Sequence, residues 1–121
     1  MQIQEVKNIL NADMLCGEAG LDMDVKMGCA CDLMSHVLSF ITSDQVLLLT
    51  GLTTPQVIYS SDAVNIKAIC FISGKRPEED TIELALERNM VLLGTEWPTY
   101  EACGKLYQHG LIGCVEYERQ R

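Results

Sequence analysis

The amino-acid sequence predicts an α/β domain of three layers, α/β/α, in which helices cover both faces of a mainly parallel sheet. Three apolar segments of strand length, at 46–49, 68–72 and 90–93, show no polar alternation. Such continuous runs are typical of strands that are buried on both faces. Each run is followed by a loop rich in Gly, Ser, Thr or Pro and then by apolar residues at helical spacing. Strands that alternate with helices favour a parallel sheet with right-handed crossovers.

The first third of the chain contributes shorter elements to the same pattern. Apolar residues at helical spacing predict a helix over 3–11, and the glycines of 17–20 indicate a turn. A strand is expected at 25–31. A helix over 32–41 follows it, and Asp32 is a suitable N-cap for that helix.

The helices after the three apolar strands are expected at 55–64, 77–89 and 99–109. A threonine N-cap or a proline in the first turn favours each of these starts. The residues concerned are Thr54, Pro55, Pro77 and Thr99. Gly110 is a natural stop for the last helix. The tail from Leu111 is either a short strand or a frayed end.

Length and composition indicate one globular domain over residues 1–121. Of these 121 residues, 48% are hydrophobic and 21% are charged, which is typical of folded proteins. No linker or low-complexity segment divides the chain. The start is polar and differs from a secretory signal, and no apolar stretch approaches the ~20 residues that span a bilayer. A cytoplasmic protein is therefore expected.

The net charge of −8 excludes some classes of partner. Nucleic acids and anionic membranes both need positive charge that neutralises phosphate, so neither is expected as a partner. Aromatic residues make up only 6% of the chain, which disfavours a base-stacking surface.

The loops that follow the three apolar strands form the candidate ligand site. Ligands of parallel sheets bind at the carboxyl ends of the strands, where helix N-termini attract anions. The candidate residues are Thr50, Gly51, Thr53, Thr54, Ser73, Gly74, Lys75, Arg76 and Thr95. Lys75 and Arg76 add positive charge, which suits a nucleotide or a phosphorylated metabolite. The competing interpretation is structural, because turns and caps need the same residue types and acidic residues at 78–80 occupy one helix end.

The six cysteines raise a second, minor hypothesis. Cys70 and Cys103 lie in apolar contexts and are expected in the core. Cys29, Cys31 and His36 could form part of a thiol or metal site that Cys114 or His109 completes. Metal sites usually show four clear ligands, so neither a metal nor a cofactor is expected.

The common catalytic motifs of phosphate loops, dinucleotide folds, metalloproteases and serine hydrolases are absent from the sequence. No enzyme is therefore expected, and a binding module is favoured. A purely structural adaptor between proteins is the alternative. It would present a large exposed apolar patch rather than a pocket among the loops.

An ordered set of short segments over about residues 3–111 resembles the DRTGG domain. The segments are GEAGL at 17–21, DLMS at 32–35, LLTG at 48–51, SGKRP at 73–77, IELA at 82–85, VLLGT at 91–95 and TYEA at 99–102. The signature that gives this family its name would fall after the strand at 46–50. Here Leu52, Thr53 and the residues up to 56 replace it, without the aspartate, the arginine or the paired glycines.

The resemblance implies a stand-alone regulatory domain with a short C-terminal tail. Similar domains accompany phosphotransacetylases, CBS-containing pyrophosphatases and the N-terminal part of HPr kinases, and catalysis there lies elsewhere. The resemblance thus implies an HPr kinase N-terminal-domain-like fold, a bacterial origin, a homodimer and docking on a partner enzyme. It also suggests an adenine nucleotide as the ligand.

Overall fold

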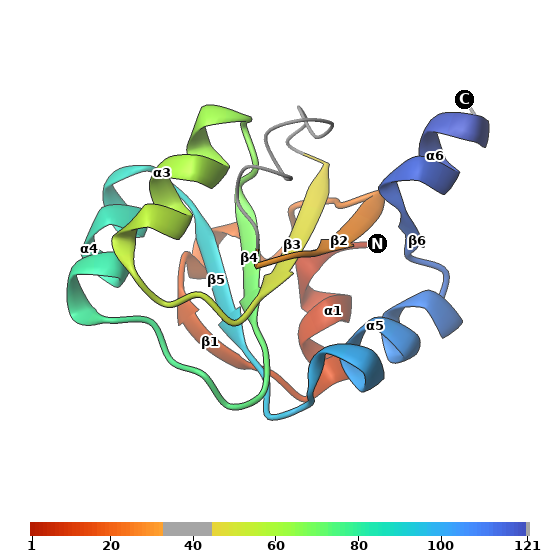
Figure 1. Cartoon of the computed structure of the whole chain (residues 1–121), viewed down its shortest axis with the longest axis horizontal. Coiled ribbons are helices and arrows are strands. Elements are labelled where there is room, and N and C mark those ends of the chain that lie inside the picture. Colours follow the sequence, from red (N-terminus) through yellow and green to blue (C-terminus); the bar gives the residue numbers. More distant parts are fainter. Residues whose placement is uncertain (33–44, 121) are drawn as a thin grey trace.

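The computed structural model describes residues 1–32 and 45–120, and six strands of this part form one sheet in the order β1-β5-β4-β3-β2-β6 (Figure 1). The strands from β5 to β6 in this order are parallel, and β1 joins the sheet at the other edge, antiparallel to β5. The strands are β1 (Asp13–Cys16), β2 (Met27–Ala30), β3 (Val46–Thr50), β4 (Ala68–Phe71), β5 (Val91–Gly94) and β6 (Ile112–Gly113). The predicted mainly parallel sheet is confirmed.

Helices cover both faces of this sheet, as Figure 1 shows. On one face α1 contacts α5, and on the other α3 contacts α4. The helices are α1 (Ile3–Leu10), the 3-10 helix η1 (Glu18–Gly20), α3 (Pro55–Ala63), α4 (Glu79–Glu87), α5 (Thr99–Gln108) and α6 (Cys114–Gln120). The three-layer prediction is therefore correct. None of the described helices has the length and apolar character of a membrane span.

Alternate residues of β3 fill two separate cores, which explains why this strand lacks polar positions. Leu47 and Leu49 pack with α1 and α5, whereas Val46 and Leu48 pack with α3 and α4. All five residues of the strand are buried. Successive side chains of a strand point to opposite faces, so a strand between two helical layers needs apolar residues throughout.

One helix begins at a different residue from the one predicted, and another has a different N-cap. The helix expected from Pro77 begins at Glu79, because the Glu78 amide and the Thr81 hydroxyl both donate to the Thr53 carbonyl oxygen, at 3.1 and 2.8 Å. These bonds hold the preceding segment against the β3 loop. Pro98, rather than Thr99, occupies the N-cap of α5, because its backbone is extended there.

The remaining differences lie near the two ends of the chain. The sequence analysis did not predict β1, a four-residue edge strand with an irregular register and two half-buried positions. The tail forms β6 and α6, so the short-strand alternative is correct for its first residues. The strand expected at 25–31 is β2. The prediction of a helix at 32–41 concerns residues that, apart from Asp32, lie outside the described part of the chain.

Asp62 links the two helices of one layer and makes the stability depend on pH. Its two carboxylate oxygens accept hydrogen bonds from Lys67, at 2.6 Å, and from Arg88 at the end of α4. The bond from Lys67, followed by the bond from Arg88, lowers the pKa of Asp62. A lowered pKa stabilises the fold above the ordinary carboxyl pKa of ~3.9, and this stabilisation is lost as the pH falls toward the lowered value.

Replacing Asp62 with asparagine should therefore lower the free energy of unfolding at pH 7 by about 1 kcal/mol, as for a partly exposed ion-pair network. The difference from the wild type should shrink as the pH falls below about 4, because the native carboxylate is then protonated. Urea titrations at a series of pH values measure both quantities. A deficit in the Asp62→Asn variant that is constant over the whole range would contradict this role of the ion pairs.

Candidate functional site

The carboxyl ends of β3, β4 and β5 lie side by side and bring the predicted loops to one edge of the sheet. Thr50 at the end of β3 is opposite Phe71 of β4, and Phe71 is opposite Gly94 of β5. The loops are also joined by backbone hydrogen bonds, since the Gly74 amide donates to the Thr95 carbonyl oxygen at 2.9 Å. All nine candidate residues therefore lie at or directly after these strand ends.

Asp32 shares this edge and binds two of the candidate residues. Its Oδ1 atom accepts hydrogen bonds from the Thr50 hydroxyl and from the Gly51 amide, each at 2.8 Å. The Gly51 amide is thus not available to an anionic ligand, and a carboxylate lies beside it. The sequence analysis treated Asp32 only as a helix cap. Its place directly after a strand could have indicated a residue of the sheet edge.

Thr95 is a structural residue of this edge. Its side chain is buried, and its hydroxyl donates to the Leu10 carbonyl oxygen at 2.8 Å. The Thr95 hydroxyl oxygen also accepts a bond from the Trp97 amide at 3.3 Å. Thr95 therefore ties the end of α1 to the loop after β5, and its hydroxyl does not face a ligand.

Removing the Thr95 hydroxyl tests this structural role. Thr95→Val should lower the free energy of unfolding by about 1–3 kcal/mol, because it leaves buried polar groups without partners. Thr54→Val is the matched control, since Thr54 is exposed and its side chain makes no capping bond. The control should stay within about 0.5 kcal/mol of the wild type in urea unfolding. Equal values for the two variants would show that the Thr95 hydroxyl has no such role.

The turn from Ser73 to Lys75 uses all of its backbone amides internally. Ser73 and Gly74 both have left-handed backbones, with φ of 59° and 71°. Their amides donate to carbonyl oxygens of the loop after β5, and the Lys75 amide donates back to Ile72 at 3.0 Å. A ligand at this turn must consequently be recognised by side chains and not by a nest of amides.

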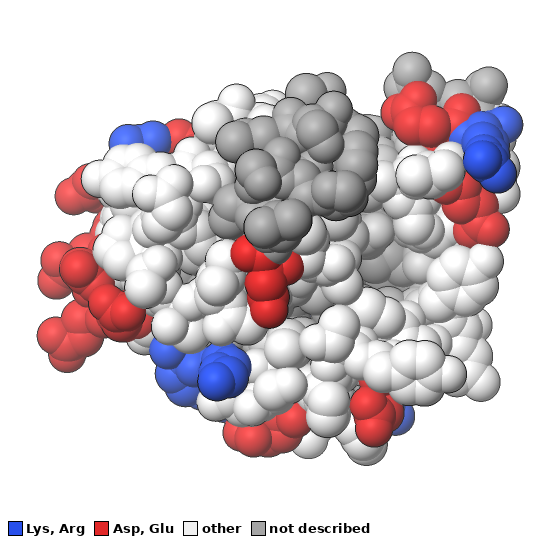
Figure 2. All heavy atoms as spheres, in the orientation of Figure 1, with Lys and Arg blue, Asp and Glu red and all other residues white. Residues whose placement is uncertain are grey.

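Lys75 in this turn and Arg76 directly after it differ in what their side chains contact. Arg76 lies 2.9 Å from an Asp13 oxygen and 3.5 Å from a Glu96 oxygen, so its charge is balanced. Lys75 is exposed and has no acidic partner among residues 1–32 and 45–120. Figure 2 shows a basic group at the lower left of the view, with acidic side chains over α4 to its left and further acidic side chains below it.

The loops at this edge of the sheet also carry hydroxyl groups. Those of Ser73, Thr53 and Thr54 make no hydrogen bond within the part of the chain that the structure describes. Among the described residues of this edge, Lys75 and these three hydroxyls are side-chain groups without a polar partner. This set can bind a single phosphate, since an ammonium supplies the charge and hydroxyls donate.

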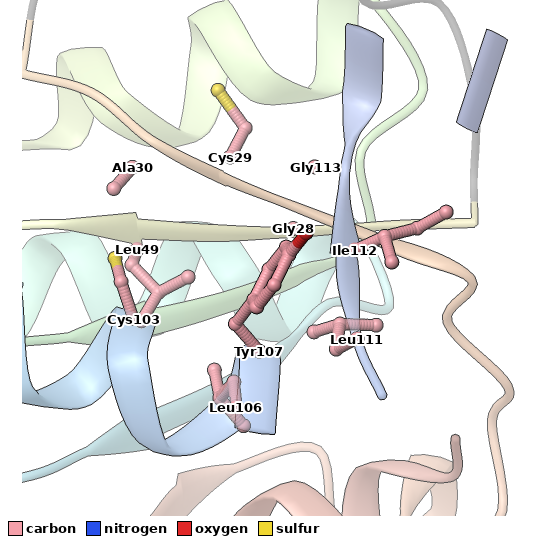
Figure 3. A pocket seen from close by; sticks show the side chains of 10 residues that line it. All are labelled: Gly28, Cys29, Ala30, Leu49, Cys103, Leu106, Tyr107, Leu111, Ile112 and Gly113. Carbon is pink, nitrogen blue, oxygen red and sulfur yellow. The ribbon is translucent and has the colours of Figure 1, made fainter. Parts of the chain in front are cut away.

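A pocket of about 120 Å³ lies between α5, β2 and β6, and the sequence analysis did not find it (Figure 3). Its lining is mostly apolar and consists of Gly28, Cys29, Ala30, Leu49, Cys103, Leu106, Tyr107, Leu111, Ile112 and Gly113. Gly28 keeps it open, because a Cβ atom there would lie 3.3 Å from the Leu111 side chain. Small residues inside two neighbouring strands could have indicated this space.

The cysteines occupy three kinds of environment. Cys70 is fully buried as expected, and burial raises the pKa of its thiol to about 12. Cys103 is half-buried and lines the pocket, which corrects its assignment to the core, because α5 presents it toward β2. Cys29 and Cys31 both pack against the core that α3 and α4 cover.

The metal hypothesis gains no further ligand from the described residues. Within residues 1–32 and 45–120, no three His, Cys, Asp or Glu side chains are placed to hold a metal ion. His36 lies outside the described residues. His109 Nδ1 is 2.8 Å from the Lys105 carbonyl oxygen at the end of α5.

Comparison with known proteins identifies the fold. No family model matches the chain. No curated protein matches it either. A matching solved structure is the CBS and DRTGG regulatory region of Clostridium perfringens pyrophosphatase, complexed with its activator diadenosine tetraphosphate. The TM-score is 0.68 at 13% sequence identity, and the match covers 88% of this chain and 46% of that one.

The comparison defines the fold class as an α/β domain with a fold similar to that of this regulatory region. The resemblance found in the sequence is thus confirmed at the level of the fold. The chain spans about half the length of the regulatory region that it matches.

Proposed function

We propose that the chain is a non-catalytic regulatory module that binds a small phosphorylated ligand at the carboxyl edge of its sheet. The observation on which this proposal rests is Lys75. It is exposed on the edge that also carries the hydroxyls of Ser73, Thr53 and Thr54, it has no acidic partner among the described residues, and its turn is already held by backbone bonds. No contact within the described residues therefore gives the Lys75 side chain a role in stabilising the fold.

The chemistry of this edge favours a ligand that presents one phosphate to Lys75. Glu96 and Asp32 lie on either side of the turn, so a compact cluster of phosphates would meet negative charge. A nucleotide can place one phosphate at Lys75 and extend its base along the sheet edge. The diadenosine tetraphosphate bound by the pyrophosphatase region supports an adenine nucleotide as the first ligand to test.

Titration calorimetry with diadenosine tetraphosphate, ADP and AMP tests this proposal. Lys75→Ala should weaken binding about tenfold, as expected for the loss of one charge-assisted contact of about 1.4 kcal/mol. Lys26→Ala is the matched control, because this exposed lysine lies at the amino end of β2, on the opposite edge of the sheet. The control should bind as the wild type does.

Arg76 is unsuitable as the test residue, since its ion pairs with Asp13 and Glu96 would be lost with its charge. Equal binding by Lys75→Ala and the wild type would place the ligand elsewhere. Absence of binding by all three nucleotides would reject the nucleotide sensor.

A partner-docking adaptor is the second candidate function, and one surface favours it. Tyr100 is 87% exposed and Tyr107 is 56% exposed on α5, next to the apolar pocket. This part of the molecule is largely uncharged in Figure 2. Exposed aromatic groups beside an apolar hollow are typical of protein interfaces. The proposed partner is a second copy of the chain or an enzyme, and sedimentation equilibrium of the purified chain distinguishes a homodimer from a monomer.

A further inference from the structure

Cys29 and Cys114 follow directly on paired positions of neighbouring strands. β2 pairs with β6 in parallel, and Gly28 opposite Gly113 is the last pair of this ladder. The next residue on each segment is a cysteine. The Cys114 Sγ atom lies 3.7 Å from the Gly28 carbonyl oxygen, so the first residue of α6 remains close to β2.

The two sulfur atoms share one environment. Both residues are half-buried and pack against the core that α3 and α4 cover, whereas Cys16 and Cys70 are buried. Figure 3 shows that the Cys29 sulfur points to the side of β2 opposite Cys103. The Cys29 side chain thus points away from the cysteine of the pocket, and its thiol forms a hydrogen bond with the thiol of Cys114.

The segment around Cys114 can adjust to form a bond. A disulfide needs Cα atoms about 4.4–6.8 Å apart, and neighbouring strands lie about 4.8 Å apart. A Cβ atom added to Gly113 would have no heavy atom within 4 Å, and α6 contains no buried residue. A small shift of α6 toward β2 would consequently disturb little packing.

The interaction between the two thiols makes them chemically unequal. A hydrogen bond from the Cys29 thiol lowers the pKa of Cys114, against the opposing effects of burial and of the Glu118 charge. The same bond, together with burial, raises the pKa of Cys29. Cys114 is therefore the thiol that more readily becomes a nucleophilic thiolate.

We propose that Cys29 and Cys114 are a redox modification site that forms a reversible intramolecular disulfide with a low-molecular-weight disulfide as oxidant. The Cys114 thiolate attacks one sulfur of the oxidant, whose S–S bond breaks and releases one thiolate. Cys29 then loses its proton to solvent, attacks the Cys114 sulfur of the mixed disulfide and displaces the second thiolate. Two protein thiols are thereby oxidised, and one small disulfide is reduced to two thiols.

The bond would join β2 to the start of α6 and fix the last part of the pocket wall. Ile112 and Gly113 line the pocket immediately before Cys114, and Cys29 lines it on β2. Oxidation would therefore restrain the wall that these residues form. This site is distinct from the phosphate site proposed at Lys75, which follows β4, because β3 lies between β4 and β2 in the sheet.

Peptide mapping of the full chain tests the disulfide directly. The reduced protein is incubated with oxidised glutathione, alkylated and digested with trypsin without reduction. Cleavage at lysine and arginine leaves Cys29 and Cys31 in the peptide 27–67 and Cys114 in the peptide 106–119. We expect these two peptides to be linked within one chain, with Cys29 as the linked residue on fragmentation, and the link to disappear after reduction.

Serine variants provide matched controls. Cys31→Ser and Cys103→Ser should keep the link, whereas Cys29→Ser and Cys114→Ser should lose it while keeping the circular dichroism spectrum of the wild type. Separate glutathione adducts on Cys29 and Cys114 without a link would overturn the proposal, as would a link that survives in Cys29→Ser. If a variant does not fold, fragmentation of the wild-type peptides still decides between Cys29 and Cys31.

Discussion

Replacing Phe71 with alanine should lower the free energy of unfolding by about 3–5 kcal/mol, the range for large aromatic residues truncated in a core. Phe71 is fully buried at the carboxyl end of β4 and packs in the core covered by α3 and α4. Its loss leaves a cavity that the two helices cannot fill without moving. Because small domains are stable by about 5–15 kcal/mol, the variant would retain only part of its stability.

Urea unfolding followed by circular dichroism measures this effect. Tyr100→Ala is the matched control, because Tyr100 is an aromatic residue of similar size that is 87% exposed. The control should stay within about 0.5 kcal/mol of the wild type. A loss below about 1 kcal/mol for Phe71→Ala would contradict the two-core architecture described for the sheet.

Gly17→Ala should have the second-largest effect, about 3 kcal/mol, because a backbone clash adds to conformational strain. Gly17 has φ of 82°, and a Cβ atom there would lie 2.4 Å from the Met90 carbonyl oxygen and 2.8 Å from the Val91 Cα atom. Both neighbours are backbone atoms at the start of β5. Relief of the clash therefore requires β5 or the loop after β1 to move.

Gly110→Ala separates the two contributions to this effect. Gly110 also has a left-handed backbone, with φ of 102°, but a Cβ atom there would have no heavy atom within 4 Å. Its substitution should cost about 1–2 kcal/mol, which is the strain alone. Thermal unfolding of both variants gives the comparison. Equal losses would show that the close approach of Gly17 to β5 is absent in solution.

The sequence predicts the central layers of the fold because their physical requirements are local. Both faces of β3, β4 and β5 are buried, so their sequences are continuous apolar runs without alternating polar residues. The helices between these strands have apolar stripes that pack against the sheet. The edge strands are harder to predict. β1 is four residues long and β6 is two, and their pairing partners, β5 and β2, are more than seventy residues away along the chain.

The candidate site was predictable in place but not in detail. The order of strands and loops places Thr50, Ser73 and Thr95 on one edge, since carboxyl ends of parallel strands meet there. Which of their groups are used internally depends on distant partners. The Thr95 hydroxyl bonds to Leu10, and Arg76 pairs with Asp13. These contacts join segments more than sixty residues apart, so no local sequence pattern predicts them.

The adjacency of Cys29 and Cys114 was missed for the same reason. The sequence analysis grouped Cys29 with its neighbours Cys31 and His36, and it treated Cys114 only as a further metal ligand. The register of β2 with β6 instead brings a cysteine 85 residues further along the chain next to Cys29.

The most direct test of the proposed ligand site is an NMR titration of the 15N-labelled chain with diadenosine tetraphosphate. The account predicts saturable shifts of the Ser73, Gly74 and Lys75 amide signals, with unchanged signals for Tyr107 and Ile112 beside the apolar pocket. Shifts confined to α5 and β6, or no shift at any amide at millimolar nucleotide, would contradict a phosphate site at the carboxyl edge of the sheet.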